Sequence, residues 1–152
     1  QYPLTMARIF IMNLETENII EKVILEFYKK ATTDVQLGYH FRKIQEFQLD
    51  EFKHHPLRPP IEAFADHLPI INEFWNRQLG AEAKQSDIQF DLINKHFYLS
   101  LRLGELRRFH LLFNETIEEF SAELSEKSYY QPWLQKLDHF VNIFSRSKIF
   151  KN

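Results

Sequence analysis

The sequence has no cysteine and only three glycines in 152 residues. Without thiols, disulfides and thiolate metal sites are excluded, and nothing in the composition argues for secretion. Each glycine falls where a helical pattern has run out, which is typical of a mostly helical protein. Alternation of apolar and polar residues never extends beyond a few positions, so the pattern gives no indication of β-strands.

Long apolar runs and an excess of charge of one sign are also missing. No apolar run approaches the roughly 18 residues that span a bilayer, so we expect no membrane partner. The formal net charge is −2, and the densest basic pair is at 107–108. Nucleic acid is not an expected partner, because phosphate binding needs a concentrated basic footprint. The first residues lack the pattern of a signal peptide, so the expected location is the cytoplasm.

Aromatic side chains are abundant: 15% of the residues, with 15 Phe, 6 Tyr and 2 Trp. A chain of this size needs fewer flat, bulky side chains to fill an ordinary core. Two interpretations follow, an aromatic-rich core and a flat aromatic ligand. The motifs of phosphate-binding loops, serine hydrolases, zinc proteases and EF-hands are all absent.

Apolar residues at helical spacing predict long helices over about 61–79 and, after Gly104, from 106 to 124, and a last helix from 133 to 144. Another helix is expected to start at Thr16–Asn18, and a looser segment, 81–103, is expected to contain a helix ending near His96. We therefore predict one all-α domain over residues 16–152, packed like a globin rather than a regular bundle, after an N-terminal extension of residues 1–15.

Three histidines lie on or beside the apolar stripes of different predicted helices: His67, His96 and His110. Tyr28 lies on a fourth helix. A lone histidine in such a place is usually a hydrogen-bonded core residue or exposed at the boundary. Three such histidines together with the Tyr28 phenol favour a ligand pocket over three unrelated core or boundary residues. Haem suits these residue types, since it needs an apolar crevice, an axial nitrogen and polar groups on the opposite side.

Four stretches occur in an order that makes this hypothesis more specific. They are "EFYKKATTDVQLGYHF" (26–41), "DHLPIINEFWNRQLG" (66–80), "NKHF" (94–97) and "RRFHLLFNETIEEF" (107–120). In that order they resemble the B helix with its turn, the E helix, the end of the F helix and the G helix of group III truncated haemoglobins, a family of small bacterial globins. The resemblance covers roughly residues 16–125, and the stretch between Phe41 and His67 is longer than the family pattern.

The resemblance implies a bound haem b with His96 as the proximal iron ligand. It places His67 across the haem and Tyr28 in the same distal pocket, as donors to a bound ligand. The family usually has a distal tryptophan on the G helix, where this sequence offers Phe109 or His110; we favour Phe109. The remaining residues that the resemblance assigns to the haem or the core beside it are Phe41, Ile71, Phe74 and Trp75.

The expected function is binding of O2, NO, CO or a similar diatomic ligand, with turnover by an external reductase as an extension. Nitric-oxide dioxygenase and peroxidase activities remain open, because a fold does not fix a reaction. The alternative is a haem-free globin-like module for interaction or regulation. The sequence does not choose between a monomer and a weak homodimer.

Overall fold

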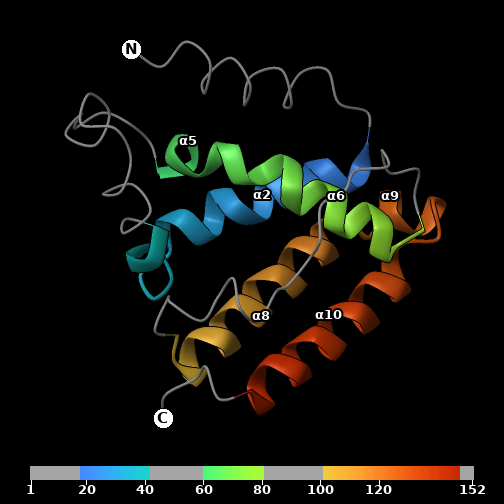
Figure 1. The fold of residues 1–152 in the computed structure, drawn as a ribbon. Coiled ribbons are helices and arrows are strands. Elements are labelled where there is room, and N and C mark those ends of the chain that lie inside the picture. The colour runs from blue at the N-terminus through green and yellow to red at the C-terminus, as the bar shows by residue number, and fades with distance from the viewer. Residues whose placement is uncertain (1–17, 42–59, 81–100, 148–152) are drawn as a thin grey trace. The chain divides into compact units, whose positions relative to one another are not determined.

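The computed structural model describes residues 18–41, 60–80 and 101–147, which fall into two compact units (Figure 1). One unit lies within residues 1–72 and the other within residues 73–152. No strand occurs in the described ranges, so the all-α prediction is confirmed for them. The predicted extension 1–15, the long segment 42–59 and the helix expected to end near His96 lie outside them. The described elements are α2 (Ile19–Thr33), α5 (Pro60–Phe64), the 3-10 helix η1 (Ala65–His67), α6 (Leu68–Gln78), α8 (Leu103–Glu119), α9 (Ser121–Glu126) and α10 (Tyr130–Arg146).

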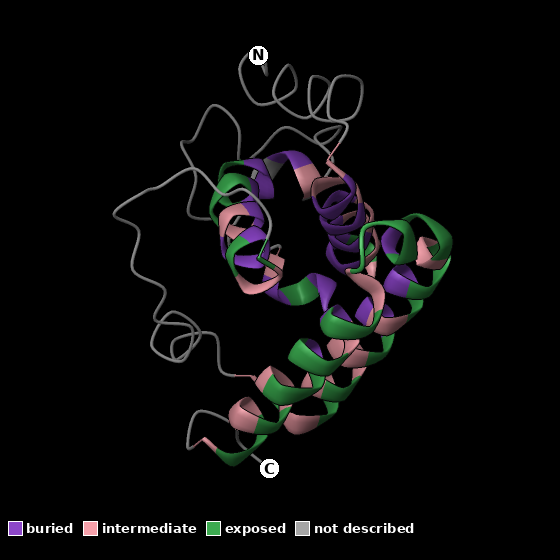
Figure 2. Ribbon diagram, turned by 90° about the vertical axis from the view of Figure 1, so that its right-hand side faces the viewer, coloured by how far each residue is buried: buried purple, intermediate pink, exposed green. Residues whose placement is uncertain are grey.

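Helix α2 begins where the sequence predicts a helix start. The Asn18 side-chain oxygen accepts the backbone N–H groups of Ile20 (2.9 Å) and Glu21 (3.3 Å), which would otherwise lack intrahelical partners. The predicted apolar face is buried along the helix, as the purple ribbon in Figure 2 shows. After the helix, Asp34 Oδ2 accepts the N–H groups of the next turn, and the chain is helical again over 38–41. The buried residues of α2 are Ile19, Ile20, Val23, Ile24, Leu25, Phe27, Tyr28, Ala31 and Thr32.

The helix predicted over 61–79 is interrupted, which corrects that prediction. Between α5 and α6 the chain makes the 3-10 turn η1, where the Leu68 N–H donates to the Ala65 carbonyl three residues earlier. Helix α6 starts at Leu68 and has Pro69 in its first turn. α6 begins in the first unit and ends in the second.

In the second unit, α8 and α10 pack against each other and run in opposite directions (Figure 1). An aromatic core joins them to the end of α6. Trp75 lies 5.6 Å from both Phe113 and Trp133, and these two rings are 5.8 Å apart, all measured between ring centroids. Burial of these rings and of aliphatic neighbours stabilises the unit. The buried residues of α8, α9 and α10 are Leu112, Phe113, Thr116, Ile117, Leu124, Trp133 and Leu137.

Two details of the second unit differ from the sequence pattern. The continuous stripe predicted from 106 to 124 is divided at Phe120, which leaves the helical region with ψ 18° and separates α8 from α9. Gly104 lies inside the first turn of α8 rather than beyond a helix end. Between α9 and α10 the chain turns at Ser128, which adopts a left-handed φ of 63°, and α10 begins at Tyr130, three residues before the predicted start.

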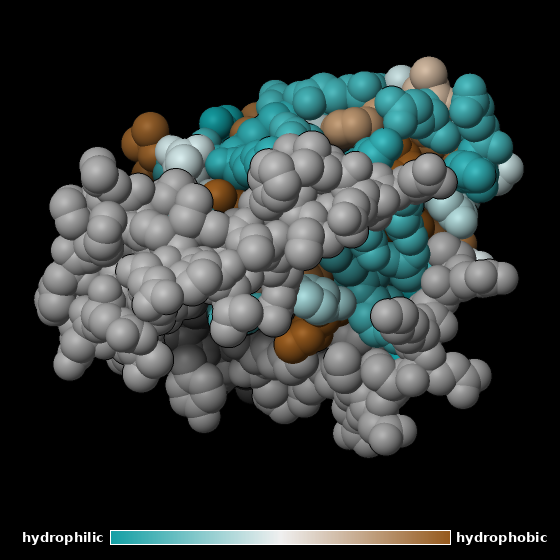
Figure 3. All heavy atoms as spheres, turned by 90° about the horizontal axis from the view of Figure 1, so that it is seen from above, coloured by the Kyte–Doolittle hydropathy of each residue, from teal (hydrophilic) through white to brown (hydrophobic). Residues whose placement is uncertain are grey.

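The described part of the chain contains no helix with the length and apolar composition needed to cross a membrane. Figure 3 shows mainly hydrophilic residues on the described surface seen from above, with hydrophobic residues in small separate groups. Large hydrophobic side chains with substantial exposure are Val35, Tyr39, Ile70 and Leu111.

Candidate functional site

Four aromatic side chains in the first unit form what we call the Phe64 cluster: Tyr28, Phe41, Phe64 and His67. The Phe64 ring is stacked with Tyr28 (4.8 Å, 26° between planes) and with His67 (4.7 Å, 9°). Phe41 meets Phe64 edge-on at 5.0 Å and Tyr28 at 6.1 Å. Three residues that the family resemblance assigns to the haem site or the core beside it are therefore brought together around a fourth ring.

The local backbone explains how the cluster forms. Tyr28 lies on α2, which packs against α5, and the helical turn over 38–41 brings Phe41 back to the same rings. Phe64 ends α5, and His67 ends η1 three residues later. In a 3-10 helix, side chains three residues apart eclipse each other, so this pair is superposed along the helix axis.

Burial differs across the Phe64 cluster. Tyr28 and Phe64 are buried, at 9% and 7% exposure, Phe41 is half-buried, and His67 is exposed. Burial raises the pKa of the Tyr28 phenol, because the phenolate would lose its hydration. Tyr28 therefore remains a neutral O–H donor at neutral pH and well into the alkaline range. The cluster offers a buried phenol at one side and an accessible imidazole at the other.

We predict that Tyr28 does not ionise near the ordinary tyrosine pKa of about 10 in the folded protein. A Tyr28→Phe variant should show the same tyrosinate absorbance rise around that pH as the parent, while both remain folded by circular dichroism. The pKa of Tyr28 is raised in the folded state. Its contribution to the free energy of unfolding is therefore fully present below pH about 10 and is lost as pH rises above that value. A smaller absorbance rise in the variant would show that Tyr28 titrates normally.

The other predicted site residues occupy different surroundings. Ile71 is half-buried in the first unit. Four residues lie in the second unit: Phe74 packs against Phe140 (5.3 Å), Trp75 joins the aromatic core, and Phe109 packs against Phe113 (5.7 Å). The fourth, His110, has its Nε2 2.7 Å from Asp138 Oδ1. His96 lies outside the described residues.

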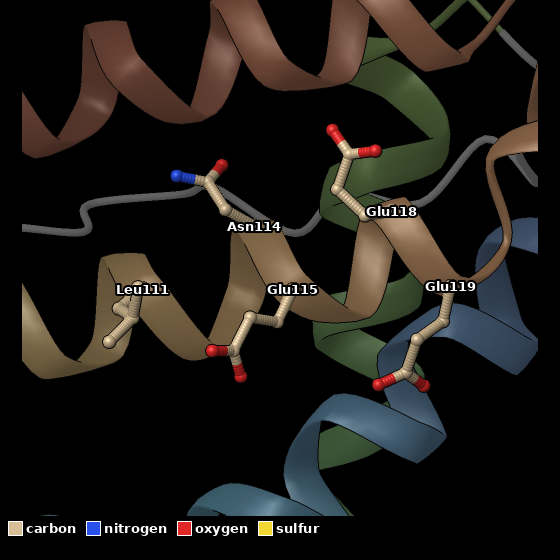
Figure 4. Close-up of a pocket in the computed structure, with 5 residues that line it drawn as sticks. All are labelled: Leu111, Asn114, Glu115, Glu118 and Glu119. Atoms are coloured by element: carbon tan, nitrogen blue, oxygen red, sulfur yellow. The ribbon is translucent and has the colours of Figure 1, made fainter.

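A shallow hollow of about 540 Å³ lies on α8 and, unlike the Phe64 cluster, is lined mainly by polar and acidic side chains (Figure 4). Asn114 and Glu118 project from one side of the helix, and Leu111, Glu115 and Glu119 from the other. Glu118 also accepts a hydrogen bond from the Tyr130 hydroxyl, which raises the pKa of Tyr130. A lining with three carboxylates and no predicted site residue is unlike the apolar crevice that a haem requires.

Phe64 falls within the helix predicted over 61–79, and the family resemblance gives it no role at the site. The structure puts it at the centre of the cluster. The available signal was its spacing of three residues from His67 together with Pro69, which favours a tight turn at that point.

Comparisons with protein family models, curated proteins and solved structures find no match. Within the described ranges, no group of three or more histidine or acidic side chains is arranged to hold a metal ion. A haem iron is held by one axial histidine, which is a different arrangement from a group of three or more ligands. The haem hypothesis therefore rests on the Phe64 cluster and on the residues of the family resemblance.

Proposed function

We propose that this chain is a haem-binding globin that binds a diatomic ligand, with His96 as the iron ligand and Tyr28 and His67 as distal donors. The observation that supports the proposal is the Phe64 cluster. Its members come from two of the four family-like stretches and from Phe64, which precedes the second stretch, and they meet in one place. A phenol, an imidazole and two phenylalanine rings suit a distal haem wall, which combines hydrogen-bond donors with apolar surface.

Haem, if bound, would supply an iron site for a diatomic ligand, and a nearby hydrogen-bond donor would stabilise partial negative charge on that ligand. The Tyr28 hydroxyl is suited to stabilise that charge, because its raised pKa keeps the proton on the phenol. Its burial strengthens the hydrogen bond, since the local dielectric constant is lower than that of water. His67, at the exposed edge of the cluster, is the second donor. Phe41 and Phe64 provide apolar surface and exclude water from the phenol.

The same donors are suited to polarise an O–O bond. Peroxide or nitric-oxide chemistry, with electrons from an external reductase, is therefore part of this proposal. Tyr28 and His67 would hold and donate protons in either reaction, and the aromatic rings would keep the buried side dry.

We predict that Tyr28→Phe raises the oxygen dissociation rate by about tenfold, because a hydrogen bond to a partly charged ligand is lost. Stopped-flow mixing of the oxygenated protein with a competing ligand measures this rate. Tyr39→Phe is the matched control, since it removes a hydroxyl from a tyrosine in the same unit that is 49% exposed. A Tyr28→Phe rate equal to that of the parent would remove Tyr28 from the distal site.

A second candidate is a haem-free module for interaction or regulation. Phe64 already contacts both Tyr28 and His67, as rings in an ordinary aromatic core do. In that case the two side chains would serve packing alone. The two candidates differ in the visible absorption of the purified protein, because only the first is coloured.

A further inference from the structure

We infer that Pro69 is a positioning residue that holds the His67 imidazole in one orientation by enforcing the 3-10 turn before α6. Its effect on a bound ligand rests on the proposed function. Its effect on the His67 ring does not, because that effect follows from the backbone and from the contact with Phe64.

The first step concerns the backbone. In an α-helix the Ala65 carbonyl would accept the N–H of residue 69. Proline has no N–H, and its ring collides with the carbonyl four residues earlier. The carbonyl instead accepts the Leu68 N–H, which is the 3-10 pattern. Pro69 therefore favours the tight turn Ala65–His67 over a continuous helix.

The second step concerns the side chains that this turn brings together. In an α-helix with 3.6 residues per turn, residues three apart are offset by about 60° around the axis. In a 3-10 helix three residues complete a turn, so the offset disappears. Phe64 and His67 have this spacing, and their rings are 4.7 Å apart and within 9° of parallel. The stack is the expected result of the turn.

The third step concerns what the stack does. Phe64 is buried and in contact with Tyr28 and Phe41, so its ring has little freedom. His67 is exposed, and among the described residues Phe64 is the only ring it contacts. An exposed imidazole otherwise samples several rotamers. Stacking selects one orientation of the His67 imidazole, as a prearranged donor requires.

The test is Pro69→Ala, which restores an N–H at an exposed position of the first turn of α6. In the parent, NMR should show the His67 imidazole protons shifted upfield by the ring current of Phe64. In Pro69→Ala that upfield shift should be largely lost. Pro132→Ala is the matched control, because Pro132 is also exposed and lies in the first turn of α10; its His67 shifts should match the parent.

A second pair of variants separates the stack from general stability. Phe64→Tyr keeps an aromatic ring and should keep the shift, whereas Phe64→Leu should lose it. For a red protein, the diamagnetic carbon-monoxide adduct is used for NMR, and ligand dissociation is measured on the same variants. Pro69→Ala should speed dissociation by about two- to tenfold, the effect expected for one aromatic pair, with the Soret band retained.

Parent-like His67 shifts in Pro69→Ala would overturn the inference about the turn. If Pro69→Ala loses the upfield His67 shifts but keeps the ligand dissociation rate of the parent, the stack has no effect on a bound ligand, and that part of the inference is overturned. A colourless parent would overturn the proposed function and the role at a ligand with it, while the His67 shifts of the chain as purified would still decide whether Pro69 holds the stack.

Discussion

The His96→Ala variant is expected to lose most of its Soret absorption. An imidazole nitrogen forms the strong axial bond to haem iron, and an alanine side chain has no atom that can replace it. Hydrophobic contacts alone would hold the haem weakly, so it should dissociate during purification. The measurement is the ratio of Soret to protein absorbance after gel filtration, compared between the parent and the variant.

His139→Ala is the control for this experiment, because His139 is exposed on α10 and has no predicted role. Its Soret ratio should equal that of the parent. An unchanged Soret band in His96→Ala would contradict the proximal assignment. If the band were lost in His67→Ala instead, the iron ligand would be His67.

The Trp133→Ala variant is expected to lose about 3–5 kcal/mol of unfolding free energy, the usual effect of deleting a fully buried large aromatic side chain. Trp133 has 0% exposure and packs against Trp75 and Phe113. Truncation leaves a cavity where α10 meets these rings. Urea denaturation followed by circular dichroism measures the change, and Lys136→Ala, an exposed substitution on the same helix, should leave the midpoint nearly unchanged.

Trp133→Phe refines this prediction. The Trp133 Nε1 atom is buried and has no hydrogen-bond partner within the described part of the chain. An unpaired buried donor is costly, so replacement by phenylalanine removes that cost together with some volume. The Phe variant should therefore be clearly more stable than the Ala variant. Equal losses in both variants would mean that the indole N–H contributes a hydrogen bond.

The helix faces were predictable because burial follows helical periodicity closely. Asn18 was expected at a helix start, and its side-chain oxygen caps α2. Trp133 and Leu137 fall at the apolar helical spacing predicted for 133–144 and are buried on α10. These features depend on residues close together in the sequence, where spacing alone decides which side of a helix is apolar.

The interruptions were less predictable, because a short change of helix type leaves the apolar stripe nearly in register. Leu68 and Trp75 continue the stripe of Phe64 across η1, so periodicity indicated one helix where the chain makes a tight turn. The break at Phe120 was hidden in the same way, since Leu124 remains buried beyond it. Pro69 lacks an N–H, so its backbone chemistry opposes a continuous α-helix at this point.

The site was predictable as a set of residue types but not as a set of contacts. Tyr28 and His67 were expected near each other through the family resemblance, and the structure links them through Phe64. Packing between α2 and α5 determines that link, and no spacing along the sequence encodes it. For the same reason, the hydrogen bond between His110 and Asp138, 28 residues apart, was not foreseen.

The central claim is that this chain binds haem, and the most direct test is the visible absorption spectrum of the purified protein. The proposed function predicts a red-brown protein with a strong Soret band that shifts when carbon monoxide is added to the reduced form. A colourless protein that gains no Soret band when haem is added would contradict it, and the Phe64 cluster would then be an aromatic core of a haem-free helical module.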